Sequence, residues 1–554
     1  MKIYKTPFSL ICFVTIIVVT SCNFKSQKAD LILHNAVALS CDGSDQKSVS
    51  MAIAISDGII VAKGPERAIL NSFTSDKKIN LKQAVIYPGF IDAHAHFTGY
   101  ALSLQTVDLV GTTSYQDVLN RTQAYALSHS TGWITGRGWD QTDWETPTFP
   151  TLTLLDELFP LRPVAIRRID GHALLANSAA LKLAGLSKVC SIKGGEMLSF
   201  EDGTPTGILI DGAADSLLSV IPSIDRVTKI KALQEAEQHL FSRGLTSVVD
   251  AGLDVSDIQL IDSLQKAGSL SIRVVAMASG IYPNLDSTFA IGPQSSDRLI
   301  ARSIKFYMDG SLGSRGAALL EPYSDRPSHS GFIFQDPDEF YNTLLQADEL
   351  GFQVATHCIG DSAVRNVLNI YNKVLGGHND KRWRIEHAQV VAPSDLPLFA
   401  SASIIPSVQP THATSDMYWA GQRLGRNRIR SAYTYRDLEG VLGMLPLGTD
   451  MPVEDIDPIK TFYAATIRKD AKGYPENGYH IDQSLSRESA LHGMTIWAAI
   501  ANFQDESVGS IEVGKWADLV ILDRNLLTAP TETLLDTKIL RTFVSGIETY
   551  NSDK

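Results

Sequence analysis

Five separated segments of the chain each end an apolar, strand-like run with a side chain that can bind a metal ion. The segments are IDAHAHF, IKFYMDG, VATHCIG, WRIEHAQ and LPLGTDMPV. In chain order they supply His94, His96, Lys305, His357, His387 and Asp450. Histidine and carboxylate side chains are the usual protein ligands of zinc at hydrolytic sites. The set therefore predicts a hydrolytic metal centre, with zinc as the expected metal.

The spacing within the first segment supports this interpretation. Residues two apart on a β-strand point to the same face, so His94 and His96 can bind one ion together. Taken singly, each candidate has an ordinary structural explanation: a lone histidine is often a hydrogen-bonded core residue, and Asp450 fits a turn or a helix cap. Their joint occurrence at the ends of successive strand-like runs favours a metal site.

Lys305 is the exception in this set, because an ammonium group repels metal ions. A buried lysine loses its proton readily. The neutral amine could then add carbon dioxide and become a carbamate that bridges two divalent ions, about 3.5 to 4 Å apart as in other two-metal hydrolases. If Lys305 is not carbamylated, one ion held by the histidines and Asp450 is expected.

Strand-like and helix-like segments alternate through the middle of the chain. The candidate strands are VIYPGFIDAHAHF, LTSVVDAG, SIRVVAMAS, SIKFYMDG, FQVATHCIG, RWRIEHAQ, SIIPSVQP and VLGMLPLGTD. Helical spacing of apolar residues occurs between them, for example over 227–243 and 337–350. Eight strands with intervening helices predict an α/β fold, a TIM-like (β/α)₈ barrel over residues 87–505. Catalytic groups of such barrels lie at the carboxyl ends of the strands, where the candidate ligands are found.

Both ends of the chain are rich in short alternating strands with glycine turns. Residues 29–86 and 506–550 are expected to pair into one small β-sandwich. A long insertion, residues 103–226, follows the first barrel strand and exceeds the usual length of a barrel loop. We expect it to form a lid or a pocket wall.

The amino terminus has the pattern of a signal peptide. Lys2 and Lys5 precede an apolar stretch that ends in Val-Thr-Ser-Cys22, similar to the lipobox of bacterial lipoproteins. Residues 1–22 are therefore predicted to be a lipoprotein signal, with Cys22 as the lipid anchor, 23–28 as a tether and the cell envelope as the location. An ordinary secretory signal is the alternative. The remaining cysteines are odd in number and widely spaced, which argues against a disulfide scaffold.

Composition is typical of a large globular enzyme, and nothing in it identifies the small-molecule substrate that we expect. The 554 residues are 44% hydrophobic and 20% charged, and the net charge of −12 reflects 61 acidic against 49 basic residues. No block of basic residues suggests nucleic-acid binding, and membrane contact is expected only through the lipid anchor. The oligomeric state is left open, with a homodimer as one option.

The ordered motifs resemble the amidohydrolase superfamily, and within it metal-dependent amidohydrolases similar to N-substituted formamide deformylase. The segments that carry this resemblance are YPGFIDAHAHF, KFYMDGSLGSRGA, ATHCIGD, RIEHAQ, LGTDMPV, GSIEVGKWADLVILD, GRGWDQ and RRIDGHALLANSAAL. The resemblance implies a barrel with one or two divalent metals. It also implies hydrolysis of a non-peptide C–N bond in an amide, formamide or cyclic amide by a metal-activated water.

Residue by residue, the resemblance makes His94 and His96 the first metal pair, Lys305 the lysine that is often carbamylated, and His357 and His387 further ligands. Asp450 becomes both a ligand and the catalytic base, which takes a proton from water and returns it to the leaving amine. Two departures are minor. Thr449 stands where serine is commoner, and Cys358 replaces a small alanine and should face away from the site.

Four further residues are candidates for substrate binding. Asp170 and His172 lie in a polar turn of the insertion, Arg315 follows the Lys305 strand, and His412 follows the seventh strand. A salt bridge is the alternative role for Arg315, and simple loop exposure is the alternative for His412. Two other functions remain open: a lactonase or phosphotriesterase that uses the same metal centre, and a non-catalytic ligand-binding lipoprotein.

Overall fold

The computed structural model describes residues 26–42, 50–128, 132–192, 195–222 and 224–553. The predicted signal segment and its anchor, Cys22, lie outside the described residues. Among the helices of these described ranges, none is both long enough and apolar enough to span a bilayer.

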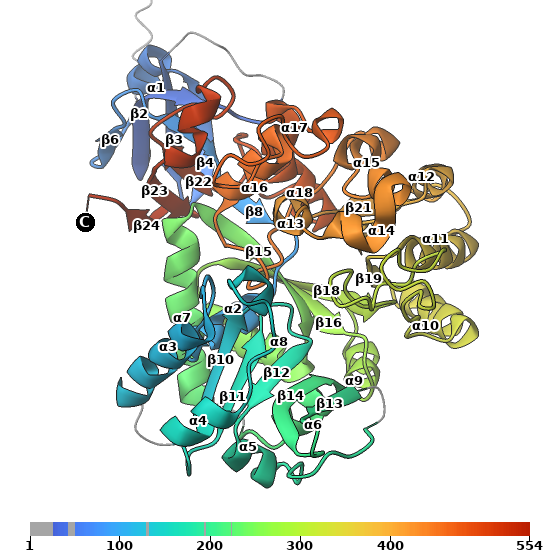
Figure 1. Cartoon of the computed structure of the whole chain (residues 1–554). Helices are drawn as coiled ribbons and strands as arrows, with labels where there is room; N and C mark the ends of the chain where they lie inside the picture. The colour runs from blue at the N-terminus through green and yellow to red at the C-terminus, as the bar shows by residue number, and fades with distance from the viewer. Residues whose placement is uncertain (1–25, 43–49, 129–131, 193–194, 223, 554) are drawn as a thin grey trace, which may run out of the picture.

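The central unit is a curled parallel sheet of a TIM-like α/β domain (Figure 1). Each strand runs parallel to the next. In spatial order the strands are β8 (Phe90–Asp92), β15 (Leu245–Leu253), β16 (Arg273–Ser279), β18 (Leu299–Tyr307), β19 (Gln353–Cys358), β20 (Arg384–His387) and β21 (Ile405–Ser407). Their carboxyl ends therefore meet at one face, where the candidate ligands lie.

The predicted eighth strand is wrong as a regular element. Part of VLGMLPLGTD belongs to helix α15 (Tyr435–Leu442), and the rest is irregular chain, because Pro446 has no N–H to donate to a ladder. This segment nevertheless hydrogen-bonds to both sheet edges: the Val408 N–H donates to the Pro446 carbonyl (3.1 Å), and the Ala93 N–H donates to the Leu447 carbonyl (3.1 Å). A Cβ on Gly448 would lie 2.4 Å from the His94 nitrogen, so only glycine permits this close approach.

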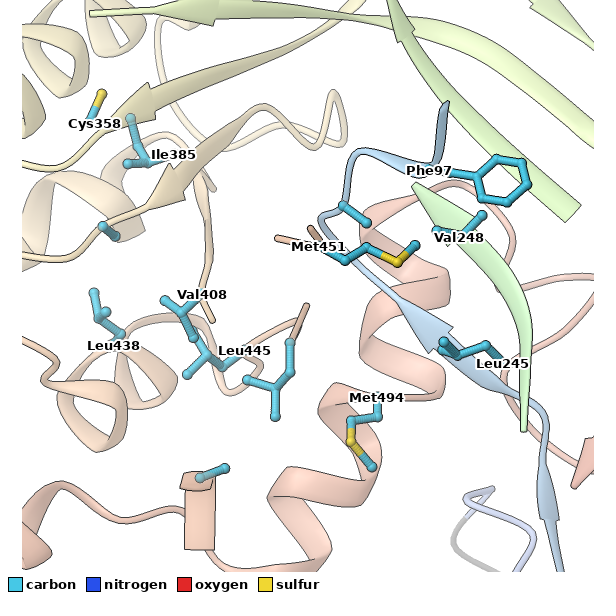
Figure 2. Packing of buried hydrophobic residues seen from close by; sticks show 14 of the residues in the cluster. Phe97, Leu245, Val248, Cys358, Ile385, Val408, Leu438, Leu445, Met451 and Met494 are labelled. Carbon is cyan, nitrogen blue, oxygen red and sulfur yellow. The ribbon is translucent and has the colours of Figure 1, made fainter. Parts of the chain in front are cut away.

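Helices cover the outside of the sheet. The main ones are α7 (Arg226–Ser242), α8 (Val255–Lys266), α10 (Pro337–Glu349), α11 (Asp361–Leu375), α12 (Leu396–Ser401), α16 (Pro458–Ile467), α17 (Arg487–Gly493) and α18 (Ile496–Ala501). The helices predicted over 227–243 and 337–350 are confirmed as α7 and α10. Buried side chains such as Phe97, Val248, Met451 and Met494 fill the space between strands and helices (Figure 2). Cys358 lies in the same apolar cluster (Figure 2), consistent with its facing away from the ligands.

The insertion after β8 forms a second, mixed sheet with its own hydrophobic clusters. Its strands, in spatial order, are β13 (Gly195–Ser199), β14 (Pro205–Asp211), β12 (Ala173–Ala176), β11 (Val164–Arg168), β10 (Ile134–Trp139) and β9 (Val107–Asp108). Helices α3 (Tyr115–Ser128), α4 (Thr153–Leu158), α5 (Ser178–Leu183) and α6 (Gly212–Leu218) pack with it (Figure 1). Trp139 and Trp144 are buried in one of these clusters and act as core residues.

Strands from both ends of the chain hydrogen-bond into one sheet. From the amino-terminal part come β2 (Leu31–Ala38), β3 (Met51–Ser56), β4 (Ile59–Pro65), β6 (Lys78–Asn80) and β7 (Val85–Pro88). From the carboxyl-terminal part come β22 (Leu519–Leu522), β23 (Ile539–Val544) and β24 (Ile547–Asn551). β7 pairs with β22 in antiparallel fashion and joins the two sets. The pairing of the termini is present, while their arrangement as a two-layer sandwich stays a prediction.

A buried ion pair connects this terminal sheet to the barrel. Arg273 on β16 is 2% exposed and donates to Asp518 through Nε (2.6 Å to Oδ2) and Nη2 (3.1 Å to Oδ1). Nη2 also donates to the Ser545 hydroxyl at 2.9 Å. Because both charges are buried, each depends on the other for compensation.

Replacing Arg273 with methionine is expected to lower the free energy of unfolding by about 3 kcal/mol, since Asp518 would stay buried without its partner. Chemical denaturation followed by fluorescence measures the change. The double variant Arg273→Met/Asp518→Leu should recover most of the loss. A single variant as stable as the parent protein would contradict this account.

Candidate metal centre

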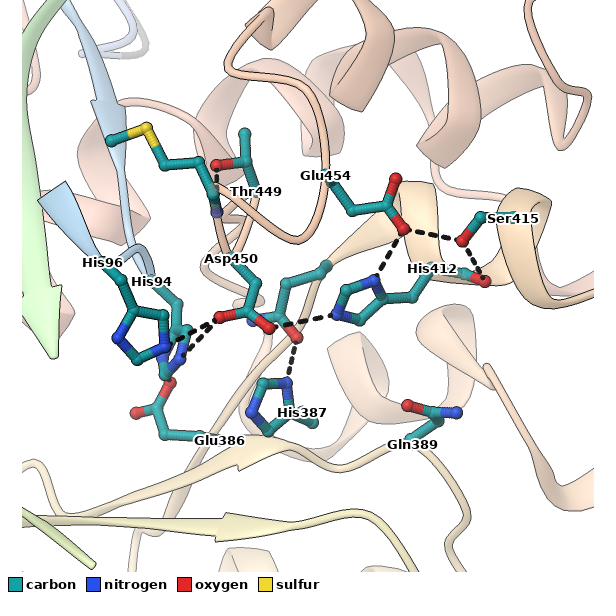
Figure 3. Close-up of polar contacts among 12 residues, drawn as sticks. His94, His96, Glu386, His387, Gln389, His412, Ser415, Thr449, Asp450 and Glu454 are labelled. Carbon is teal, nitrogen blue, oxygen red and sulfur yellow. Dashed lines mark hydrogen bonds and ion pairs between the residues drawn. The ribbon is translucent and has the colours of Figure 1, made fainter. Parts of the chain in front are cut away.

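His94 and His96 follow β8 and are held in defined orientations by their Nδ1 atoms. His94 Nδ1 donates to Glu386 Oε2 at 2.5 Å, and His96 Nδ1 donates to the Ala251 carbonyl at 2.8 Å. Both Nε2 atoms consequently face Asp450 Oδ1, at 3.5 Å from His94 and 3.2 Å from His96 (Figure 3). This is the arrangement expected of two imidazoles that share one ion with a carboxylate.

Lys305, near the end of β18, extends towards the same point from another strand of the sheet. Its Nζ lies 3.1 Å from His94 Nε2, and the residue is 1% exposed. Burial lowers the pKa of Lys305 to about 8, although the Glu386 and Asp450 carboxylates act in the opposite direction. A substantial fraction of the amine is therefore neutral at mildly alkaline pH.

His357 and His387 complete the cluster. The ring centroid of His387 lies 4.6 Å from that of His357 and 4.9 Å from that of His94. His387 Nδ1 donates to Gln409 Oε1 at 2.7 Å. The other ring nitrogen, Nε2, is therefore the one that can bind a metal ion. Burial lowers the pKa of His357 to about 3 and holds the pKa of His387 well below its usual value, so both rings are neutral near pH 7.

The residues fit a divalent metal ion on two independent observations. Two groups of side chains have ligand atoms within 4.8 Å of one another: His94, His96 and Asp450, and His387, His412 and Asp450. In addition, His357 Nε2 and Asp450 Oδ1 are buried without a hydrogen-bond partner among the described residues. Buried polar atoms are nearly always satisfied, so these atoms have the character of metal ligands.

His412 links Asp450 to a second carboxylate. Its Nε2 lies 3.5 Å from Asp450 Oδ2, and its Nδ1 donates to Glu454 Oε1 at 2.9 Å (Figure 3). Ser415 donates to the same Glu454 oxygen at 2.6 Å. Burial alone would lower the pKa of His412, but Asp450 and Glu454 raise it well above its ordinary value. His412 can therefore donate hydrogen bonds to both carboxylates.

The pKa of Asp450 itself is held well below its usual value. Burial acts to raise it, but the neighbouring imidazoles of His412 and His96 outweigh that effect. The carboxylate is therefore ionised, which suits both metal binding and proton acceptance.

Glu386 was not among the functional residues predicted from the sequence, although it lies beside His387 in the RIEHAQ motif. Glu386 is fully buried, and Arg384 Nε lies 2.6 Å from its Oε1. Arg384 lowers the pKa of Glu386 to about 2, together with His94 and against the effect of burial. A charged carboxylate on His94 Nδ1 fixes the ring orientation and strengthens the ring as a metal ligand.

We expect Glu386→Gln to weaken metal affinity by roughly 10- to 100-fold, because the amide accepts the His94 hydrogen bond less strongly. Competition with a chromogenic chelator measures the affinity. Glu439→Gln, on α15 away from the cluster, is the control. Unchanged metal affinity in Glu386→Gln would show that the carboxylate only packs against Arg384.

The other predicted substrate residues contact side chains outside the ligand cluster. Asp170 accepts a hydrogen bond from Arg168 at 2.6 Å, and His172 Nδ1 donates to Asp211 Oδ1 at 2.8 Å. Arg315 is engaged by Asp325, with Nη2 2.8 Å from Oδ2, which is the salt bridge left open as its alternative role. Contact of these residues with a substrate stays a prediction.

Comparisons with known proteins agree with this site. The chain matches the amidohydrolase family over residues 77–550. It is 32% identical over 541 residues to the protein LONG AFTER FAR-RED 3 of Arabidopsis thaliana, covering 94% of this chain and 92% of that protein. It is 26% identical over 546 residues to an N-substituted formamide deformylase of Arthrobacter pascens, covering 95% and 99% of the two chains.

A solved structure supports the same conclusion. An uncharacterized metal-dependent hydrolase from Pyrococcus horikoshii superposes with a TM-score of 0.74 at 29% sequence identity, covering 91% of this chain and 99% of that one. The family match spans most of the chain and includes every candidate ligand described above. The chain is a member of the amidohydrolase family.

Proposed function

We propose that the protein hydrolyses a non-peptide C–N bond of a small molecule, in an amide, formamide or cyclic amide. The observation that carries this proposal is the position of Asp450: its ionised carboxylate lies against the Nε2 atoms of His94 and His96 on one side and against His412 on the other. Family membership and the formamide deformylase among its relatives support the choice of a C–N bond.

The ligands proposed for one or two divalent ions, zinc by preference, are His94, His96, Lys305, His357, His387 and Asp450. When bound, the metal lowers the pKa of a water ligand and polarises the substrate carbonyl. If two ions bind, Lys305 is proposed to be a ligand as a carbamate, which would supply negative charge to the centre.

Asp450 is proposed to accept a proton from the attacking water and to deliver it to the departing amine nitrogen. One water is consumed: a C–O bond forms, the C–N bond breaks, and the amine leaves with that proton. His412 lies 3.5 Å from the Asp450 carboxylate and would hold it in place, while Glu454 fixes the orientation of His412. The contact with His412 would keep the carboxylate ionised, which is the form that can accept a proton.

The test is a substrate panel with purified, zinc-loaded protein that lacks residues 1–22. Turnover of formamides, acyclic amides or cyclic amides, lost after chelation and restored by added zinc, is the expected result. Turnover of lactones or phosphotriesters alone would overturn the C–N assignment and favour a lactonase or a phosphotriesterase. No turnover, combined with tight binding of an amide, would favour the non-catalytic binding protein.

The cellular location and the partners of the protein are also proposals. We propose a lipoprotein of the bacterial cell envelope, anchored through Cys22, with a small-molecule substrate and no nucleic-acid partner. Metabolic labelling with a fatty-acid analogue tests the anchor, since a Cys22→Ala variant should lose the label and leave the membrane fraction.

A further inference from the structure

Arg137 lies in the insertion, on strand β10, in the motif GRGWDQ. The chain that follows this strand reaches the mouth of the barrel: Thr142 and Asp143 line a cavity of about 540 Å³ together with Ser415 and Glu454. Glu454 is the carboxylate that contacts His412 beside Asp450. The chain that directly follows the strand of Arg137 therefore borders the cavity that Glu454 also lines.

The guanidinium of Arg137 has few partners for a group that is mostly withdrawn from solvent. Its Nε (3.3 Å) and Nη2 (2.9 Å) donate to one acceptor, the Ile169 carbonyl. The adjoining Gly171 has a φ of +77°, and a Cβ there would lie 3.6 Å from Arg137 Nη2, so the turn packs closely against the guanidinium. Within the described part of the chain, no carboxylate lies within 4 Å of this cation, and Nη1 makes no hydrogen bond.

A second cation stands beside it. Arg167 on β11 is the register partner of Arg137, and paired residues of adjacent strands share a face of the sheet. Arg167 Nε is buried without a hydrogen-bond partner, and its closest carboxylate contact is Asp215, 3.7 Å from Nη2. Like charges directly opposite each other are destabilising, and the exposed Asp215 is the one carboxylate within 4 Å of either guanidinium among the described residues, so the pair is only partly neutralised.

The other nearby acidic residues do not complete this neutralisation. Asp108, the register neighbour of Arg137 on β9, accepts the N–H of Val110 at 3.0 Å. Asp170 is bound by Arg168. Burial and Arg167 lower the pKa of Arg137, whereas Asp450 and Asp170 act to raise it.

We propose that Arg137 binds a carboxylate of the substrate, with Arg167 adding to the positive field. This inference rests on the proposed hydrolysis and specifies its substrate class: an amide or formamide with a carboxylate close to the scissile bond, such as an N-acyl amino acid. Guanidinium groups are well suited to carboxylates because they offer several parallel N–H donors.

The test compares N-formylalanine with its neutral amide, N-formylalaninamide, on the zinc-loaded protein. The parent protein should prefer the carboxylate. Arg137→Gln should lower kcat/KM for N-formylalanine by roughly 10- to 100-fold, mainly through KM, and change the neutral compound less than about threefold. Arg137→Lys should keep part of the preference. Arg121→Gln, on α3 of the same insertion and paired with Asp117, is the matched control and should behave as the parent.

A binding measurement separates this inference from the proposed function. Calorimetric titration of N-formylalanine into Asp450→Asn protein should show binding that is lost when Arg137→Gln is added. Equal binding of the acid and the amide, or equal turnover of both by the parent protein, would overturn the role of Arg137 and leave C–N hydrolysis standing. Arg137-dependent binding of the acid without turnover of any C–N compound would instead contradict the proposed function.

Discussion

Asp450→Asn is expected to lower kcat by roughly 100- to 10,000-fold, the range typical when a general acid–base residue is removed. The amide keeps the size of the carboxylate and one oxygen, but it cannot accept a proton at neutral pH. It also loses the negative charge that His96 Nε2 (3.2 Å) and His412 Nε2 (3.5 Å) face in the parent protein. The measurement is steady-state hydrolysis of the best substrate from the panel.

Two further measurements make this result specific to the chemistry. Metal content per chain separates loss of the base from loss of the ion, and circular dichroism shows whether the barrel is intact. Asp455→Asn is the matched control: it lies on the same loop but is exposed and paired with Lys460. An Asp450→Asn protein with more than a tenth of the parent kcat would remove Asp450 from the proton-transfer role.

The ligands could be predicted to lie at strand ends, because hydrophobic strands and the position of catalytic groups in barrels follow general rules. His94 and His96 obey strand alternation, and the structure brings both to Asp450. The two-residue spacing was thus sufficient to predict that these two imidazoles converge on one point. No comparable local pattern indicated which groups accept hydrogen bonds from their Nδ1 atoms.

The positions of His387 and Asp450 in the site depend on backbone that departs from regular strand geometry. Glu386 and His387 are neighbours on β20, and regular alternation would point them to opposite faces. Both nevertheless reach the centre, because His387 has a φ of +72° and turns its ring inward where the strand ends. Asp450, with a φ of +58°, also lies on non-strand backbone. Such conformations are uncommon in non-glycine residues and are set by tertiary contacts, so the sequence did not reveal Glu386.

The acceptors of the outer polar contacts were equally hidden, since they are distant in the chain. The His96 ring is fixed by the Ala251 carbonyl, 155 positions away, and the His387 ring by Gln409. A backbone carbonyl carries no sequence signal, and a lone glutamine has many ordinary roles. By contrast, the insertion was recognisable by its length, but its polar residues could be ranked only once strand register placed Arg137 beside Arg167.

Lys305→Ala is expected to lower both activity and metal content. If the lysine carries a carbamate, its loss removes a negatively charged bridging ligand, and the number of ions per chain should fall from two towards one. Activity should fall by roughly 100- to 1,000-fold, as when a preorganised electrostatic group is removed from other active sites. Elemental analysis of the purified protein and steady-state kinetics measure the two effects.

Small carboxylic acids distinguish a carbamate from a plain lysine. Lys305 is buried, so alanine leaves a space beside His94 that propionate can enter with its carboxylate towards the ions. Added propionate should therefore restore part of the activity of Lys305→Ala. Lys305→Met fills the same space with an apolar chain of similar length, so it should be equally inactive but not rescued. Lys266→Ala, on the exposed end of α8, controls for loss of any lysine.

The pH dependence of metal loading follows from the state of the amine. Carbon dioxide adds only to the neutral form, and burial lowers the pKa of Lys305 to about 8, so the neutral fraction rises as pH increases through that value. Reconstitution of metal-free protein with zinc and bicarbonate should accordingly be faster at pH 8.5 than at pH 6.5, and should slow when carbon dioxide is removed. Unchanged metal content and activity in Lys305→Ala would exclude the lysine from the centre. One ion, held by histidines and Asp450, would then account for the chemistry, because these ligands suffice for a catalytic zinc site.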